Sequence, residues 1–223
     1  MALLIQETGD GSHTLFSEEY NEIYHSRRGA WQESEHVFIH SGLDYVLKQL
    51  SVIQILEVGF GTGLNAMMTL DHAAKNNTRI FYTGLEPIPV DFQLIEQLNY
   101  PQFLKDETLQ ALFRKIHQCA WDTEEAISPD FTLLKSSAKI ENFQADISYD
   151  LVYFDAFGPS KQPEIWDIKI FERIKSLMKP GAVLVTYSSK GQLKRDLKNL
   201  NFEVQSLPGP PGKREMTRAV RLV

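Results

Sequence analysis

The sequence predicts an α/β protein with an open, mostly parallel sheet that carries helices on both faces. From residue 53 onward, apolar runs of the kind found in strands alternate with helical patterns. Strands separated by helices are expected to pair in parallel, because a parallel connection needs a long crossover. A glycine-rich stretch joins the first run to the first helical pattern. The last two runs lie too close together for a crossover helix, which predicts an antiparallel hairpin.

Seven strands are expected, and helices connect most of them. The strand segments are 53–58, 80–85, 131–134, 151–155, 182–187, 202–207 and 217–223. The helical segments are 62–75, about 90–98, 108–117, about 165–178 and 191–200. A turn is expected at Lys179, Pro180 and Gly181, because proline and glycine interrupt regular structure. Together these elements predict a doubly wound sheet of seven strands that ends in a hairpin.

The first fifty residues differ from the rest in composition, being rich in tyrosine, histidine and charged residues. We expect residues 1–50 to form a small N-terminal extension that ends in a helix from about Gly42. The main domain is expected at residues 51–223. Such an extension could serve packing alone or cover a ligand crevice, and we expect it to cover the active site.

The composition is that of an ordinary globular protein. Of the 223 residues, 43% are hydrophobic, which suits one large domain with a real core. No apolar run approaches the roughly 18 residues that span a bilayer, and the N-terminus lacks the basic start of a signal peptide. Cys119 is the single cysteine, so no internal disulfide is possible. These features predict a cytoplasmic protein without a membrane partner.

Charge is distributed unevenly along the chain. The net charge is −6, yet residues 1–155 hold 10 basic and 23 acidic residues while residues 156–223 hold 13 basic and 6 acidic residues. A partner responds to the local field rather than to the total, so the basic C-terminal part favours a nucleic-acid partner. The stretch KGQLKRDLK at 190–198 can equally be the solvated face of a helix, and both interpretations stay open.

A glycine loop, QILEVGFGTGLNAM at 54–67, lies where the first strand meets the first helix. Gly59, Gly61 and Gly63 permit a tight turn and a close approach to a ligand, and the N–H groups of the helix start point at that ligand. A dinucleotide-binding loop would place its third glycine at position 64, where this chain has Leu64. Glu57 would repel a pyrophosphate but suits an amino group and a sulfonium, which indicates S-adenosylmethionine.

A second carboxylate supports the same cofactor. Glu86 directly follows the strand at 80–85, at the carboxyl end where open α/β sheets bind ligands. There it can accept hydrogen bonds from both ribose hydroxyls of an adenosine. The alternative is a surface acid that caps the turn before Pro87.

Four motifs together resemble one known family. They are EVGFGTGLN (57–65), DAFGPSKQPEIW (155–166), GKREM (212–216) and the upstream EIYHSRRGAWQESEHVFI (22–39). They resemble the methyltransferase module of the bifunctional tRNA 5-methylaminomethyl-2-thiouridine biosynthesis proteins (MnmC), over residues 13–223. The resemblance implies a Rossmann-like class I methyltransferase that uses S-adenosyl-L-methionine.

The resemblance also implies a reaction and its partners. The expected substrate is the aminomethyl group on the modified wobble uridine, in the anticodon region of tRNA, and the expected product is methylaminomethyl-uridine. In the bifunctional family a flavin-dependent oxidase follows this module, whereas the present sequence ends at Val223. We therefore expect a stand-alone methyltransferase module, with a separate flavin oxidase as a conceivable partner. The oligomeric state stays open.

Candidate site residues follow from these motifs. Cofactor binding is expected at Glu57, Gly59, Gly61, Gly63, Asn65 and Glu86. Asp155 ends the fourth strand and is expected to orient the acceptor amine and take its proton. Alignment of the reacting groups should supply most of the rate. No metal is expected.

The loop after Asp155 is expected to receive the substrate base. Pro159 shapes a loop that leaves the sheet, because proline fixes φ and lacks an N–H donor. Phe157 can stack on an unpaired base. Lys213 and Arg214, within GKREM, are expected to contact tRNA phosphates. The alternatives are a capping role for Asp155, simple packing for Phe157, and solvated charge for the basic pair.

One stretch departs from the family pattern. The family usually places an acid that binds the adenine amino group after the third strand, whereas LLKSSAKIENF at 133–143 has Ser136 or Ser137 in that neighbourhood. The nearest acids are Glu141 and Asp146. A serine hydroxyl or a backbone carbonyl is expected to replace the missing acid.

Other function classes share some of these features. Aminopropyltransferases of the spermidine-synthase type also end a strand in an aspartate before a proline-containing loop, but they favour acidic pockets, whereas the C-terminal third here is basic. Another class I small-molecule methyltransferase is a further alternative. A binding module without catalysis is disfavoured, because Glu57, Glu86 and Asp155 are all present.

Overall fold

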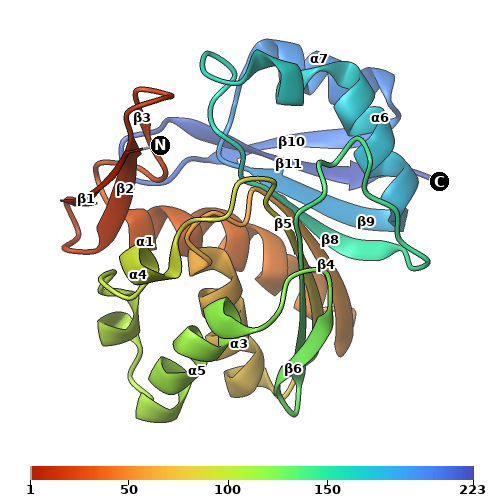
Figure 1. Ribbon diagram of the computed structural model, residues 1–223. Helices are drawn as coiled ribbons and strands as arrows, with labels where there is room; N and C mark the ends of the chain where they lie inside the picture. The colour runs from red at the N-terminus through yellow and green to blue at the C-terminus, as the bar shows by residue number, and fades with distance from the viewer. Residues whose placement is uncertain (1) are drawn as a thin grey trace.

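A twisted central sheet crosses the molecule, as the computed structural model of residues 2–223 shows (Figure 1). Its strands are β4 (Val52–Val58), β5 (Arg79–Leu85), β6 (Glu124–Ser128), β7 (Phe131–Ser136), β8 (Tyr149–Phe154), β9 (Met178–Thr186), β10 (Phe202–Pro208) and β11 (Glu215–Arg221). Over these residues the sheet has eight strands in the order β10–β11–β9–β8–β4–β5–β7–β6.

The pairing confirms the predicted parallel core and terminal hairpin. Strands β9, β8, β4, β5 and β7 are parallel neighbours, while β11 pairs antiparallel with both β9 and β10. The predicted count of seven strands is wrong by one. The extra strand, β6, pairs antiparallel with β7 at the sheet edge. Its sequence EEAIS contains two acidic residues and a single buried side chain, Ile127, so it lacks the apolar run that marks the other strands.

Helices cover both faces of the sheet (Figure 1). On one face lie α3 (Leu64–Asn76) and α5 (Glu107–Gln118), and on the other lie α6 (Ile168–Leu177) and α7 (Gly191–Asn199). Successive strand residues serve the two faces in turn, since Ile55 belongs to the first core and Leu56 to the second. The remaining short helices are α4 (Phe92–Ile95), η2 (Tyr100–Phe103) and η3 (Pro163–Trp166).

The N-terminal residues form a small sheet and a long helical segment. Strands β1 (Leu3–Glu7), β2 (His13–Ser17) and β3 (Glu22–Ile23) pair antiparallel. The helical segment comprises α1 (Ala30–Ser34), the π-helical η1 (Glu35–Leu43) and α2 (Asp44–Leu47). The predicted helix start near Gly42 is therefore wrong. Gly42 lies inside the helical run, where an added Cβ would come within 2.9 Å of Val185, so this glycine lets the segment pack closely on the sheet.

The extension shares the core of the main domain. Leu15 and Phe38 are buried in the same cluster as Ile55 and Tyr153 of the central sheet. This packing joins the two parts in one hydrophobic core. A domain boundary at residue 50 therefore stays a prediction.

Two local predictions need correction. Lys179, Pro180 and Gly181 do not form a separate turn but lie within β9, where the register with β8 shifts between Tyr149 and Leu151. They form an irregularity in a strand. The predicted helix at 165–178 begins later, because the Asp167 side chain accepts the N–H of Lys169 and caps α6.

The described part of the chain contains no helix with the length and apolar character that a membrane span requires.

Candidate active site

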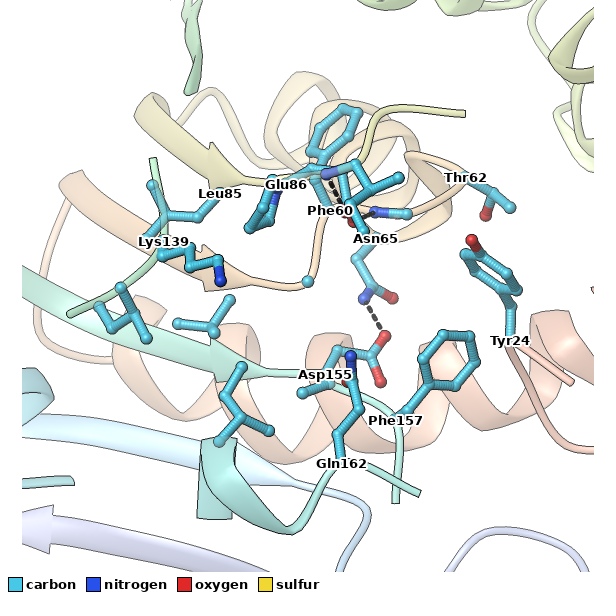
Figure 2. A pocket seen from close by; sticks show the side chains of 18 of the residues that line it. Tyr24, Phe60, Thr62, Asn65, Leu85, Glu86, Lys139, Asp155, Phe157 and Gln162 are labelled. Atoms are coloured by element: carbon cyan, nitrogen blue, oxygen red, sulfur yellow. Dashed lines mark hydrogen bonds between the residues drawn. The ribbon is translucent and has the colours of Figure 1, made fainter. Parts of the chain in front are cut away.

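A cavity of about 230 Å³ opens at the carboxyl ends of β4, β5 and β8. The chain runs from β4 to one side of the sheet and from β8 to the other, so the cavity lies at the switch point where open α/β sheets bind ligands. Four segments after strands border it, at 58–65, 85–88, 138–141 and 155–165. The N-terminal extension contributes the remaining wall through Tyr20, Tyr24 and His25, and Figure 2 shows Tyr24.

The glycine loop follows β4 and forms the floor of the cavity. Gly59 has a φ of 92°, and an added Cβ would lie 2.5 Å from the carbonyl oxygen of Asp155. Only glycine fits there, which brings the two strand ends into contact. Gly59 and Gly61 line the cavity. Gly63 does not, because it faces the ring of His117, 2.7 Å from where its Cβ would be, and starts α3.

Glu86 follows β5 and lines the cavity, and its contact with the ribose stays a prediction. Its two carboxylate oxygens accept the N–H groups of Gly61 and Ile88, both at 3.0 Å. Burial raises the pKa of Glu86, and these two hydrogen bonds oppose the rise. The carboxylate is thus fixed by the glycine loop and keeps lone pairs for hydroxyl donors from the cavity.

Asn65, in the first turn of α3, connects two acidic residues: Glu57 near the end of β4 and Asp155 directly after β8. Its Nδ2 donates to Glu57 Oε1 and to Asp155 Oδ2, each at 2.8 Å, and Figure 2 shows the second bond. Its Oδ1 is buried without a hydrogen-bond partner in the described structure. Asn65 lines the cavity, so this oxygen can accept from a donor bound there.

Glu57 lies behind Asn65 and does not line the cavity. It is fully buried, and its Oε2 accepts the hydroxyl of Tyr82 at 2.8 Å. Burial is the largest cause that raises the pKa of Glu57 well above its ordinary value. The structure therefore gives Glu57 an indirect position, from which it reaches the cavity through Asn65.

Asp155 faces the cavity directly after β8. Its pKa is raised to about 7, and burial is the largest cause. The negative charge of Glu33 raises this pKa further, while the Asn65 hydrogen bond and the charge of Lys213 oppose the rise. A carboxyl with such a pKa can release and take up a proton near neutral pH.

Phe157 lines the cavity within an aromatic cluster. Its ring lies 4.9 Å from the ring of Tyr20 and 4.9 Å from that of Tyr24, measured between centroids. The indole N–H of Trp166 donates to the Phe157 carbonyl at 2.8 Å and holds the loop. Pro159 lies outside the cavity wall. Stacking of Phe157 on a substrate base stays a prediction.

The stretch with the missing acid is organised around Asp122. The carboxylate of Asp122 accepts both serine hydroxyls, from Ser136 at 2.7 Å and from Ser137 at 2.9 Å. Neither serine lines the cavity, whose wall at this end comes from residues 138–141 instead. The serines are therefore occupied within the protein, and the backbone of 138–141 is the candidate for an adenine contact.

The two basic residues of GKREM occupy different surroundings. The Lys213 ammonium donates to Glu33 Oε1 at 2.5 Å and lies 4.0 Å from the Tyr187 ring centroid. The Arg214 side chain is exposed. Phosphate contacts of the pair stay a prediction, for which Arg214 has the more open position.

The other basic residues of the C-terminal third are likewise of two kinds, some exposed to solvent and others in contact with side chains of the protein. Lys190, Arg195 and Lys198 are exposed on or beside α7. Lys194, by contrast, pairs with Glu215 at 2.8 Å, and the Arg218 guanidinium lies 4.0 Å from the ring centroid of Tyr45.

Several residues of the site were not predicted from the sequence. Tyr24, Lys139 and Gln162 line the cavity, and the negative charge of Glu33 raises the pKa of Asp155. Tyr24 and Glu33 lie within the quoted stretch EIYHSRRGAWQESEHVFI, but no spacing rule singled them out. No group of three or more metal-binding side chains occurs among residues 2–223.

Comparisons with known proteins add to this geometry. Residues 100–222 match the model of a family described as S-adenosyl-L-methionine-dependent methyltransferase. The bifunctional tRNA 5-methylaminomethyl-2-thiouridine biosynthesis protein MnmC of Azoarcus sp. is 30% identical over 216 residues, which cover 92% of this chain and 34% of the relative. The MnmC of Ralstonia nicotianae is 28% identical over 219 residues, with coverages of 92% and 33%. The chain thus spans about a third of the length of these curated relatives.

Solved structures agree on the fold. The crystal structure of MNMC2 from Aquifex aeolicus superposes with a TM-score of 0.81 at 27% identity and covers 98% of this chain and 69% of that one. A structure of S-adenosylmethionine-bound CalS10 from Micromonospora echinaspora, an amino pentose methyltransferase, has a TM-score of 0.50 at 12% identity, covers 87% of this chain and 93% of that one, and supports the fold alone.

Proposed function

Since the chain belongs to the S-adenosyl-L-methionine-dependent methyltransferase family matched over residues 100–222, we propose that it methylates the aminomethyl group of a modified wobble uridine in tRNA. The observation that carries the proposal is Asp155, which faces the cavity from the end of β8 and has a pKa raised to about 7 by burial above all. The similarity to MnmC proteins over 92% of the chain supports the substrate. The matched family does not favour the aminopropyltransferase alternative.

The residues of the cavity fit the cofactor. The N–H groups of Gly59, Phe60, Gly61 and Gly63 are bonded within the protein. Asn65 Oδ1, by contrast, is a buried acceptor without a partner in the described structure, and it suits an amino group. Glu86 would hold the ribose hydroxyls. When bound, S-adenosylmethionine supplies a methyl group on a positively charged sulfur, and the acidic side chains that line the cavity, Glu86 and Asp155, suit that charge.

Asp155 carries the proton chemistry of the acceptor. The acceptor nitrogen must be uncharged to form a bond to carbon, so one proton has to leave it. Asp155 can take that proton, because its raised pKa makes it a stronger base than an ordinary aspartate. Asn65 holds the carboxylate in place through Oδ2, which leaves Oδ1 for the amine. Alignment supplies the larger part of the rate, and proton removal adds roughly 10²-fold or more.

The nucleic-acid partner would lie over the C-terminal part of the chain. Exposed basic side chains such as Arg214 and Lys198 can contact phosphates there. The wobble base would leave the anticodon stack to reach the cavity. A separate flavin oxidase partner and a cytoplasmic location remain predictions.

Methylation is tested with tRNA that carries aminomethyl-uridine. The protein is incubated with this tRNA and isotope-labelled cofactor, and the nucleosides are then analysed by mass spectrometry. The expected product is methylaminomethyl-uridine with one labelled methyl group. Label in a different nucleoside, or none with a protein that binds the cofactor, would overturn the proposed substrate.

A further inference from the structure

An ion pair beside Asp155 connects two distant segments of the chain. Glu33 lies on α1, and Lys213 lies in the turn between β10 and β11. The Lys213 ammonium donates to Glu33 Oε1 at 2.5 Å, and Oε2 of Glu33 accepts the N–H of Ser26 at 2.7 Å. The Glu33 side chain is only 8% exposed. The pair therefore fastens the N-terminal extension to the terminal hairpin.

The same lysine is linked to the loop that carries Asp155. Its ammonium lies 4.0 Å from the ring centroid of Tyr187, a contact that attracts the charge to the ring face. The Tyr187 hydroxyl donates to the carbonyl of Ala156 at 2.8 Å. Ala156 directly follows Asp155 in the sequence. A continuous series of contacts thus runs from Glu33 to the backbone beside Asp155.

Stability alone does not explain the pair. Removing a carboxylate from water costs on the order of several kcal/mol, and the attraction to a buried partner often fails to exceed that cost. Apolar side chains of similar size frequently replace such pairs without loss of stability. A charged pair next to a catalytic carboxylate therefore suggests a role in setting the charge there.

The charges around Asp155 favour the binding of one more cation. Apart from Glu57, whose pKa burial raises well above its ordinary value, two carboxylates, Glu33 and Asp155, interact electrostatically with one ammonium, that of Lys213. When both acids are ionised, one negative charge is in excess. A protonated primary amine arriving as the acceptor balances that charge.

We propose that Glu33 and Lys213 form a charge-setting pair that positions Asp155 for the acceptor amine, an inference that rests on the proposed function for its substrate. Glu33 and Lys213 act through Asp155 and are positioning residues. Their effects oppose each other, since Glu33 raises the pKa of Asp155 and Lys213 lowers it, while burial is the largest cause of the shift. Asn65 donates a hydrogen bond to Asp155, and the other groups that interact electrostatically with Asp155 are Glu57, Tyr82, Tyr100 and Tyr187.

The test compares Glu33→Gln with Lys213→Met. Removing the negative charge should lower the pKa of Asp155, and removing the positive charge should raise it, each by about half a pH unit or more. The titration is followed by NMR of protein labelled with ¹³C in aspartate carboxyl groups, with Asp155→Asn for assignment. The acid limb of the kcat profile should move in the same two directions, while the Kd of the cofactor stays within about twofold.

A matched control exists on the same strand. Asp150 lies at the opposite end of β8, has a side chain that is also 8% exposed, and pairs with Lys179 at 2.8 Å. Lys179→Met removes a comparable ion pair far from the cavity. It should leave the Asp155 titration and the pH profile of kcat unchanged.

The outcomes separate this inference from the proposed function. Opposite shifts of the Asp155 titration in the two variants support the charge-setting pair even if the wild-type protein fails to methylate tRNA, in which case only the substrate is wrong. Unchanged titration with a lowered Tm in both variants would make the pair merely structural and overturn the inference. If Glu33→Gln does not fold, the titration of Asp155 is compared in Lys213→Arg and Lys213→Met. The arginine variant keeps the positive charge and should keep the wild-type titration, whereas the methionine variant should shift it.

Discussion

The two halves of the cavity are built in different ways. The donor half, with the glycine loop and Glu86, comes from one stretch of chain in which two consecutive parallel strands end side by side. The acceptor half brings together Asp155, the aromatic cluster of the extension and the Glu33–Lys213 pair, whose members are 180 residues apart. Local spacing specifies the first half, whereas the second depends on the completed fold. Variants of one half should therefore leave the other intact.

The largest expected effect is on the acceptor half. Asp155→Ala removes the proton acceptor and the hydrogen bond that Asp155 Oδ2 accepts from Asn65 Nδ2, so kcat should fall by about 100-fold or more. The Kd of the cofactor, measured by calorimetry, should stay within about twofold. A comparable loss of cofactor affinity would show that the two halves are not separable.

The reciprocal variant lies in the donor half. Glu86→Ala removes an acceptor for the ribose hydroxyls and frees the N–H groups of Gly61 and Ile88, which should weaken cofactor binding by about tenfold. Glu141→Gln is the control, because Glu141 also lines the cavity but is exposed. Equal cofactor affinities of the two variants would show that Glu86 does not contact the ribose.

The pH dependence of stability sharpens the comparison further. The pKa of Asp155 is raised to about 7 in the folded protein, so the folded state holds this proton more tightly than the unfolded chain. The stability from this group is complete below the ordinary aspartate pKa and is lost as pH rises through about 7. Asp155→Asn should avoid that loss, so its Tm relative to wild type should rise by a few degrees between pH 5 and pH 8. A constant difference in Tm would contradict the raised pKa.

The smallest expected effect concerns the nucleic-acid surface. Arg214→Glu should raise the KM for tRNA severalfold and reduce the salt dependence of binding by about one phosphate contact. Arg195→Glu, on the exposed face of α7, serves as the comparison. A stronger effect from Arg195 would place the tRNA over α7 rather than over the terminal hairpin.

The sequence predicted the donor half better than the acceptor half, for a physical reason. Gly59, Gly61 and Glu86 were expected near the ligand and all line the cavity, because each lies just after the end of a parallel strand and the two strands end side by side. Glu57 was expected to face the ligand directly but is covered by Asn65 and bonded to Tyr82. No local pattern reveals that a tyrosine of the neighbouring strand reaches that carboxylate.

The acceptor half shows the same limit more strongly. Asp155 was predicted because an acid follows an apolar run, and the structure brings it to the cavity. Lys213 was assigned to tRNA phosphates from its motif alone, whereas its ammonium contacts the buried Glu33. A serine hydroxyl or a backbone carbonyl near residue 136 was expected to contact the adenine, but Asp122 accepts the hydroxyls of both Ser136 and Ser137. Such partners are set by tertiary packing.

Strand order has a consequence for biosynthesis. β11 follows β10 in the sequence, yet it lies between β9 and β10 in the sheet. A nascent chain that has not yet released residues 215–221 from the ribosome exposes an unpaired edge of β9, and exposed edges invite association with other chains. Maturation of the catalytic pocket therefore has to wait for the final strand to insert, and truncation within it should yield aggregation rather than a weaker enzyme.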